Sequence, residues 1–213
     1  MVDPGEKVVL VTGASSGIGW ETALAFARRG ARIALTARRE SRLYELADAI
    51  ARFGGDAGVF PADIRDEKAV TSMVESVIDR FGRIDILINN AGFGMRSTVT
   101  SAPTDEIREV FETNVYGTFF ATRAVLPYML EQGSGHIMNI CSMIVQFPVP
   151  FNSYYGATKA AISNWSRAMR AELHPLGIRV TEVYPALTRT EFTTASRTFL
   201  DKRAYAELPR FGQ

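Results

Sequence analysis

The stretch KVVLVTGASSGIG, residues 7–19, decides the fold of this chain. It begins with a strand-like run, Lys7–Thr12, bends through a glycine-rich segment and leads into a segment of helical period from about Gly17 to Arg29. Glycines at such a turn let an anion approach the main-chain N–H groups, and the helix N-terminus adds a partial positive charge. The stretch therefore predicts a turn that binds a pyrophosphate or, as the alternative, a tight turn without a ligand.

The turn glycines are spaced G-x-x-x-G-x-G, which differs from the G-x-G-x-x-G of the usual dinucleotide fingerprint. We expect the turn to bind the pyrophosphate of a dinucleotide in spite of that difference. The residues expected to contact it are Gly13, Ser15, Ser16, Gly17, Ile18 and Gly19.

Beyond this turn, short β-rich runs alternate with longer segments of helical period, and no linker or repeat interrupts them. The expected strands are Arg32–Thr36, Asp56–Pro61, Arg83–Asn89, Gly135–Ser142 and Ile178–Tyr184. The expected helices are Ser41–Phe53, Asp66–Phe81, Thr104–Gln132 and Ser153–Leu176. This alternation predicts an α/β fold, a Rossmann-like doubly wound parallel sheet in a single domain, with ligands at the carboxyl ends of the strands.

Composition narrows the class of protein. The 213 residues fit one domain, and 46% hydrophobic with 22% charged residues is ordinary for a soluble globular protein. A net charge of +1 gives no basic field for nucleic acid, and no apolar stretch reaches the ~18 residues of a membrane helix. Cys141 is the only cysteine and Met1–Lys7 does not resemble a secretory signal, so we expect a reducing, cytoplasmic setting.

The end of the second strand bears on which dinucleotide is bound. An NAD site places an acidic residue there, against the ribose 2′-hydroxyl. Here the strand ends in Thr36-Ala37 and is followed by Arg38 and Arg39. Arginine binds phosphate bidentately, so this pair favours the 2′-phosphate of NADP(H). Two solvated arginines at the start of a helix are the alternative.

Tyr155 and Lys159 lie four residues apart at the start of the last long helix, which places them on one face. A free tyrosine has a pKa of about 10, too high for ready proton exchange at neutral pH. A nearby ammonium lowers such a pKa by roughly 1–3 units, and a positively charged nicotinamide would favour the phenolate further. The pair therefore predicts a general acid/base.

The context of this pair strengthens that interpretation. Asn89-Asn90-Ala91-Gly92 follows the fourth strand, Asn114 lies in the long central helix, and Ser142 ends the fifth strand thirteen residues before Tyr155. With these motifs in this order, the chain resembles the short-chain dehydrogenase/reductase family. The resemblance extends from the glycine turn to Pro185–Thr190.

The resemblance implies a role for each of these residues. Tyr155 would be the catalytic acid/base, and Lys159 would lower its pKa while binding the nicotinamide ribose. Ser142 would hold the substrate oxygen, and Asn114 would position a water for proton relay. Further cofactor contacts implied by the family are Asp63 and Ile64 at the adenine, Asn90, Ala91 and Gly92 at the adenosine ribose, and Pro185, Thr188 and Thr190 over the nicotinamide. Taken singly, Ser142 could be a loop cap, Asn114 a polar helix residue and Asp63 a helix cap.

Two features depart from the family pattern. The usual Pro-Gly after the sixth strand is Pro185-Ala186 here. Family members also continue through a further helix to a seventh strand, whereas this sequence stops at Gln213. We therefore expect the final strand to be missing, from truncation or an omitted tail, and Ile178–Tyr184 to form the sheet edge.

The function predicted from these features is an NADP(H)-dependent oxidoreductase that interconverts a hydrophobic ketone or aldehyde and an alcohol. Residues 1–140 would mainly bind cofactor and residues 141–213 would supply catalysis and substrate binding, without a metal. The alternative is a non-catalytic NADP(H)-binding sensor or scaffold of the same fold. Broadly apolar long helices favour a homodimer or homotetramer. An apolar substrate wall is expected from Met143–Phe151 with Phe93, Met95, Phe192, Phe199 and Leu200, although half of these could instead pack into the core or an interface.

Overall fold

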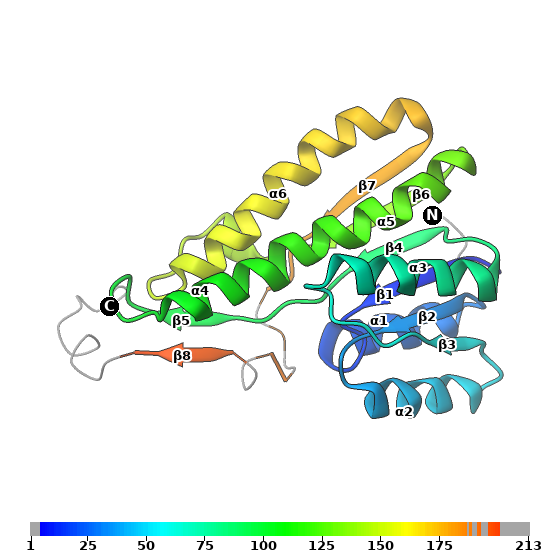
Figure 1. The fold of residues 1–213 in the computed structure, drawn as a ribbon, viewed down its shortest axis with the longest axis horizontal. Coiled ribbons are helices and arrows are strands. Elements are labelled where there is room, and N and C mark those ends of the chain that lie inside the picture. The colour runs from blue at the N-terminus through cyan, green and yellow to red at the C-terminus, as the bar shows by residue number, and fades with distance from the viewer. Residues whose placement is uncertain (1–4, 187, 189–190, 193–195, 201–213) are drawn as a thin grey trace.

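Six parallel strands form the central sheet of the computed structural model, which describes residues 5–186, 188, 191–192 and 196–200 (Figure 1). The strand order is β3-β2-β1-β4-β6-β7, so the order reverses between β1 and β4. The strands are β1 (Val8–Thr12), β2 (Arg32–Thr36), β3 (Ala57–Val59), β4 (Ile86–Asn89), β6 (Gly135–Ile140) and β7 (Ile178–Val183). The predicted doubly wound α/β fold is confirmed, and ligands of such a fold bind where the order reverses.

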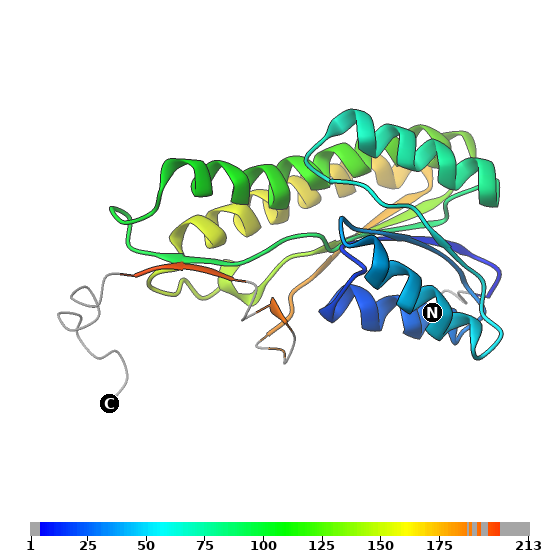
Figure 2. The same cartoon turned by 60° about the horizontal axis from the view of Figure 1, so that its bottom comes forward.

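Helices cover both faces of the sheet (Figure 2). α1 (Gly17–Ala27) and α2 (Glu40–Ala51) pack on one face, and α3 (Glu67–Phe81), α5 (Gly117–Glu131) and α6 (Ser153–Leu173) pack on the other. Every residue of β1 is buried because the strand lies between these two layers. Among the described residues β7 pairs only with β6, which confirms its predicted place at the sheet edge. No helix in the described part of the chain is both long and apolar enough to cross a membrane.

The helix expected over Thr104–Gln132 is not continuous. It consists of α4 (Thr104–Phe111), a π-helical turn (Glu112–Tyr116) and α5. A π-helical turn inserts a residue into the helical repeat, which rotates the side chains that follow it. This turn carries Asn114, whose side chain is thereby directed into the protein, where it is buried.

The last long helix is also shorter than expected. α6 ends at Leu173, and a 3₁₀ turn, His174–Leu176, replaces the final turn of the expected helix. Pro175 has no N–H for the helix, and Gly177 adopts φ +77°, a left-handed conformation that stops it.

A second, two-stranded sheet was not expected from the sequence. β5 (Met95–Ser97) and β8 (Arg197–Phe199) pair in parallel although about a hundred residues separate them. The Ser101 hydroxyl also donates to the Phe199 carbonyl. Figure 1 shows this pair beyond the end of the main sheet, beside the N-terminal part of α6. The pairing places β8, which follows β7 along the chain, beside β5.

Candidate active site

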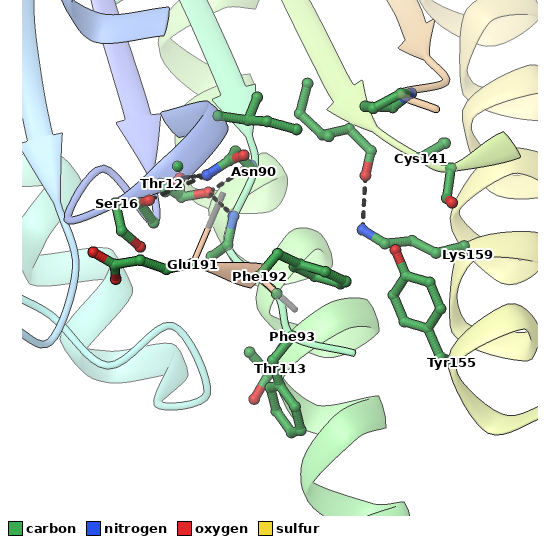
Figure 3. Close-up of a pocket in the computed structure, with 18 of the residues that line it drawn as sticks. Thr12, Ser16, Asn90, Phe93, Thr113, Cys141, Tyr155, Lys159, Glu191 and Phe192 are labelled. Carbon is green, nitrogen blue, oxygen red and sulfur yellow. Dashed lines mark hydrogen bonds between the residues drawn. The ribbon is translucent and has the colours of Figure 1, made fainter. Parts of the chain in front are cut away.

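A cavity of about 640 Å³ opens at the carboxyl ends of the strands, where the order reverses. It extends from the glycine turn to α6 (Figure 3). Of the residues singled out from the sequence, those lining it are Gly13, Ser15, Ser16, Gly17, Ile18, Arg38, Arg39, Asp63, Ile64, Asn90, Ala91, Gly92, Ser142, Tyr155, Lys159, Pro185 and Thr188. Gly19 and Asn114 do not line it, and Thr190 lies outside the described residues.

The glycine turn is held by the residues that follow β4. Thr12 Oγ1 accepts hydrogen bonds from the backbone N–H groups of Asn90 and Ala91, both at 3.0 Å. Asn90 Nδ2 donates to the carbonyls of Thr12 and Gly13, at 3.0 and 3.2 Å. The Asn90 side chain therefore braces the turn, a task that the expected position beside the adenosine ribose did not include. Thr12 was not singled out, although every strand-end hydroxyl beside such a turn is a candidate for this role.

Two of the glycines are required by close packing inside the turn. A Cβ on Gly13 would lie 2.8 Å from Ala91 Cα, and Gly13 also has φ +66°. A Cβ on Gly19 would lie 2.5 Å from the Gly13 carbonyl oxygen. Gly19 is thus needed behind the turn, where it is buried, and not at the cavity surface.

The N-terminus of α1 faces the cavity with its donors available. Its N-cap residue, Ser16, makes no side-chain capping hydrogen bond, and Ser16, Gly17 and Ile18 all line the cavity. Unpaired N–H groups at a helix start attract an anion. Nearby, the buried Thr36 Oγ1 has no hydrogen-bond partner among the described residues and lies in the cavity wall. These groups fit a dinucleotide whose pyrophosphate lies on the turn.

The two arginines after β2 differ in their contacts. Arg38 is exposed and lines the cavity. Arg39 Nε donates to Ser15 Oγ at 3.1 Å, and its Nη1 pairs with the Glu191 carboxylate at 3.2 Å. Arg39 thus contacts the glycine turn through Ser15, whereas Arg38 lines the cavity. Glu191 was not found from the sequence, since nothing local marks it as a partner of Arg39.

Asp63 lies in the cavity wall as an ion-paired carboxylate. Arg65 contacts it at 2.6 Å, and this hydrogen-bonded guanidinium lowers the pKa of Asp63. Arg65 also pairs with Glu109 at 2.9 Å. Asp63 is therefore ionised at neutral pH, as an acceptor for an adenine amino group requires.

Tyr155 and Lys159 are both buried at the opposite end of the cavity (Figure 3). Lys159 Nζ donates to the Ile140 carbonyl at 2.7 Å and lies 5.9 Å from the centroid of the Tyr155 ring. Burial lowers the pKa of Lys159 to about 8, because it disfavours the ammonium.

The pKa of Tyr155 shifts in the direction opposite to the one expected. We expected the ammonium of Lys159 to lower it, but burial dominates and raises it, while the hydrogen bond with Ser142 works against that rise. The physical reason is that desolvation penalises a phenolate strongly, and Lys159 is itself desolvated and directed at the Ile140 carbonyl.

Ser142 has the capping role that the sequence offered as the alternative, and its role toward a substrate oxygen stays a prediction. It is the N-cap of a 3₁₀ turn, Met143–Val145, and its Oγ accepts a hydrogen bond from the Ile144 N–H at 3.3 Å. The same hydroxyl lies close enough to Tyr155 to act against the rise in its pKa. The cap therefore holds the hydroxyl beside the phenol.

Asn114 joins three elements behind the cavity. Its Oδ1 accepts from the Phe93 N–H at 3.0 Å, and its Nδ2 donates to the Phe93 carbonyl at 3.0 Å and to Thr158 Oγ1 at 3.1 Å. A Cβ on Gly92 would lie 2.8 Å from Asn114 Oδ1. The side-chain amide thus fixes the loop after β4 against α6, whereas the water relay expected of Asn114 stays a prediction.

The expected apolar wall is divided between the cavity and the core. The Tyr155 and Phe192 ring centroids lie 5.6 Å apart. Met95 and Phe199 instead join the cluster packed around Val110. The apolar side chains lining the cavity near Tyr155 are Phe93, Met143, Ile144, Phe147, Val149 and Phe192. Across the described ranges, no group of three or more His, Cys, Asp or Glu residues is placed to hold a metal ion.

Comparison with known proteins identifies the family. The family model described as short chain dehydrogenase matches residues 7–201. An uncharacterized oxidoreductase of Staphylococcus epidermidis is 39% identical over 88% of this chain and 80% of the relative. The ketoacyl reductase HetN of Nostoc sp. is 37% identical over 96% and 71%. The sulfoacetaldehyde reductase 2 of Chromohalobacter salexigens is 38% identical over 95% and 81%.

Solved structures agree as well. A short-chain dehydrogenase/reductase from Mycobacterium marinum superposes with a TM-score of 0.86 at 36% identity, covering 90% of this chain and 76% of that one. NAD⁺-bound xylitol dehydrogenase gives 0.84 at 35%, covering 87% and 72%. A metagenomic short-chain oxidoreductase in complex with NADP gives 0.83 at 31%, covering 86% and 84%.

The chain belongs to the short-chain dehydrogenase/reductase family. It is thus an oxidoreductase that interconverts carbonyl and alcohol groups with a nicotinamide cofactor.

Proposed function

We propose that the chain is an NADP(H)-dependent oxidoreductase acting on a hydrophobic ketone or aldehyde and the matching alcohol, with Tyr155 as general acid/base. The observation that carries the proposal is the placement of Tyr155, Lys159 and Ser142 in one cavity with the glycine turn and its arginines. Residues 1–140 mainly bind the cofactor, and residues 141–213 supply the catalytic and substrate-binding groups.

The chemistry of Tyr155 favours the reducing direction. Because burial raises its pKa, the phenol is protonated at neutral pH and can donate that proton to a carbonyl oxygen. Ser142 Oγ, in the same cavity as the phenol, holds the same oxygen. When bound, the nicotinamide supplies or accepts the hydride at the substrate carbon.

Lys159 acts on the phenolate that remains after proton transfer. Its pKa of about 8 leaves most of the side chain charged at neutral pH, and it projects from the same face of α6 as Tyr155. An ammonium on that face stabilises the phenolate more than the phenol. Asn114 holds the cavity floor at Phe93 and relays the replacement proton through a water.

The preference for NADP(H) rests on the residues after β2. No carboxylate occupies the strand end at Thr36-Ala37, and Arg38, Arg39 and Ser15 all line the cavity there. Two guanidinium groups beside a hydroxyl suit a 2′-phosphate. Solved neighbours bind either NAD⁺ or NADP, so the preference comes from these residues.

A titration with NADPH and, separately, NADH tests the cofactor assignment. We expect clearly tighter binding of NADPH, and equal affinities would contradict the assignment to Arg38 and Arg39. A carbonyl screen that follows NADPH consumption then tests the substrate class. Turnover of small charged carbonyls alone would overturn the hydrophobic assignment.

We also propose a homodimer or homotetramer. Aromatic side chains gather where the π-helical turn meets α5 and α6: Tyr116 is 50% exposed, and the Phe119 ring packs at a tilt against Trp165 with centroids 4.4 Å apart. An apolar surface of this kind is a common subunit contact. Light scattering at micromolar concentration should give at least twice the mass of one chain, and a monomer would contradict the proposal.

A further inference from the structure

The carboxylate of Glu191 occupies the arginines at the rim of the cavity. It lies 3.2 Å from Arg39 Nη1 and 4.0 Å from Arg42 Nη2. Arg39 is held at the same time by Ser15, which belongs to the glycine turn. Glu191 follows β7 along the chain and lines the cavity.

The neighbouring residue, Phe192, reaches the other end of the cavity, where its ring packs on that of Tyr155. Figure 3 shows Glu191 beside Ser16, Tyr155 on the opposite side, and Phe192 between them. Two consecutive residues therefore connect the arginine rim with the catalytic phenol. The ion pair between Glu191 and Arg39 therefore lies at the cavity itself and not on a distant part of the surface.

We propose that Glu191 is a specificity-determining residue, which competes with the 2′-phosphate of NADP(H) for Arg39. The inference rests on the proposed function. A carboxylate and a phosphate are alternative anions for one guanidinium fork, and two anions at the same fork repel each other. NADH carries no phosphate there and binds without displacing Glu191. Glu191 therefore weakens the NADP(H) preference that Arg38 and Arg39 would otherwise give.

The exposure of the pair makes such competition feasible. The side chains of Arg39 and Glu191 are 50% and 51% exposed, and exposed ion pairs are weak because water screens them. A phosphate with its greater charge can therefore displace the carboxylate at a modest cost. We expect the cost to appear as roughly a three- to tenfold loss of NADPH affinity.

The test is calorimetric titration of the wild-type chain and Glu191→Gln with two matched ligand pairs. The pairs are NADPH with NADH, and adenosine 2′,5′-bisphosphate with adenosine 5′-monophosphate, so the readout requires no turnover. Glu191→Gln should bind the two 2′-phosphorylated ligands about three- to tenfold more tightly, and the other two within about twofold of wild type.

Glu21→Gln is the matched control. Glu21 is an exposed carboxylate on α1 that lines the same shallow hollow as Glu191, and the described ion pairs of Arg39 and Arg42 do not include it. This variant tests whether removal of any one negative charge near the site is enough to tighten NADPH binding. In an Arg39→Gln background, Glu191→Gln should no longer change NADPH affinity, because the shared fork is gone.

The proposal is overturned if Glu191→Gln leaves NADPH affinity unchanged, weakens it, or improves NADPH and NADH by the same factor. An equal gain in Glu21→Gln would also overturn it. A wild-type chain that binds neither dinucleotide would instead refute the proposed function. The bisphosphate and monophosphate would then still report on the competition at Arg39.

Discussion

The two ends of the cavity are stabilised in different ways. At the glycine turn, polar groups of Thr12, Gly13 and Asn90 are joined by neutral hydrogen bonds of 3.0–3.2 Å. At the other end, two ionisable side chains, Tyr155 and Lys159, are buried with both pKa values displaced by burial.

The glycine-turn end of the cavity therefore has a fixed shape, whereas the Tyr155 end carries the reactive groups. Neutral, mutually satisfied hydrogen bonds keep a turn in one conformation, which suits a surface that must match a rigid pyrophosphate. A buried phenol and ammonium are held in an electrostatic environment that shifts when a proton or a charge arrives. We therefore expect changes at the first end to act on stability and changes at the second to act on turnover.

The largest expected effect is on turnover, in Tyr155→Phe. Loss of the phenolic proton should lower kcat by about 10²–10⁴-fold, as removal of a general acid does. Cofactor affinity and the free energy of unfolding should stay close to wild type, because only one hydroxyl is removed. Tyr154→Phe is the control, since the Tyr154 hydroxyl donates to the Val99 carbonyl. Comparable kcat values in the two variants would place the acid elsewhere.

Thr12→Val should act on stability, in contrast to Tyr155→Phe, which acts on turnover. It leaves the backbone N–H groups of Asn90 and Ala91 without their acceptor in a half-buried turn, at a cost of roughly 1–3 kcal/mol each. We expect urea unfolding to show a loss of about 2–4 kcal/mol. Thr12→Ser keeps the hydroxyl and should remain near wild type. A Thr12→Val chain as stable as Thr12→Ser would show that the turn does not depend on these bonds.

The sequence predicted best what depends on local pattern. Strand–helix alternation located the main-sheet strands, and the Tyr155–Lys159 spacing placed both side chains on one face of α6 because helical geometry requires it. Ser142 was assigned to the same site as Tyr155 through the family resemblance, and both residues line one cavity.

What depends on distant contacts could not be predicted in the same way. The β5–β8 pair joins residues about a hundred positions apart, and the ion pair between Arg39 and Glu191 spans 152 positions. The π-helical turn at Asn114 was not predicted either, and it accompanies contacts of Asn114 with the distant residues Phe93 and Thr158. The pKa of Tyr155 depends on burial, which a spacing does not reveal.

Lys159→Met tests whether burial of the Lys159 ammonium makes the stability of the protein depend on pH. The pKa of Lys159 is about 8 in the folded chain against 10.5 for an ordinary lysine. Between these values the unfolded chain holds more protons, so the stability of wild type should rise with pH from about 8 to 10.5. Lys159→Met should lack this rise, while exposed Lys68→Met should keep it. Parallel curves for wild type and Lys159→Met in urea unfolding would mean that the ammonium is not desolvated.

The smallest expected effect concerns the charged groups that link the two ends. Arg197 contacts Glu109 at 2.6 Å, Glu109 pairs with Arg65, and Arg65 pairs with Asp63 in the cavity wall. Arg197 also lies over the Phe93 ring, 4.7 Å from its centroid. Arg197→Gln should cost about 1 kcal/mol of stability, because partly exposed ion pairs are weak even in a network.

The pH dependence of that loss identifies its source. The hydrogen bond from Arg197 lowers the pKa of Glu109 below its ordinary value of 4.5, so the stabilisation is complete above pH 4.5 and is lost as the pH falls further. The difference in unfolding free energy between wild type and Arg197→Gln should therefore shrink below pH 4.5 and in high salt. Arg108→Gln, which removes an exposed pair with Asp105, is the control and should change stability little. A difference that persists unchanged in acid and in salt would assign the role of Arg197 to packing on Phe93, and the two ends of the cavity would then be joined by contact and not by charge.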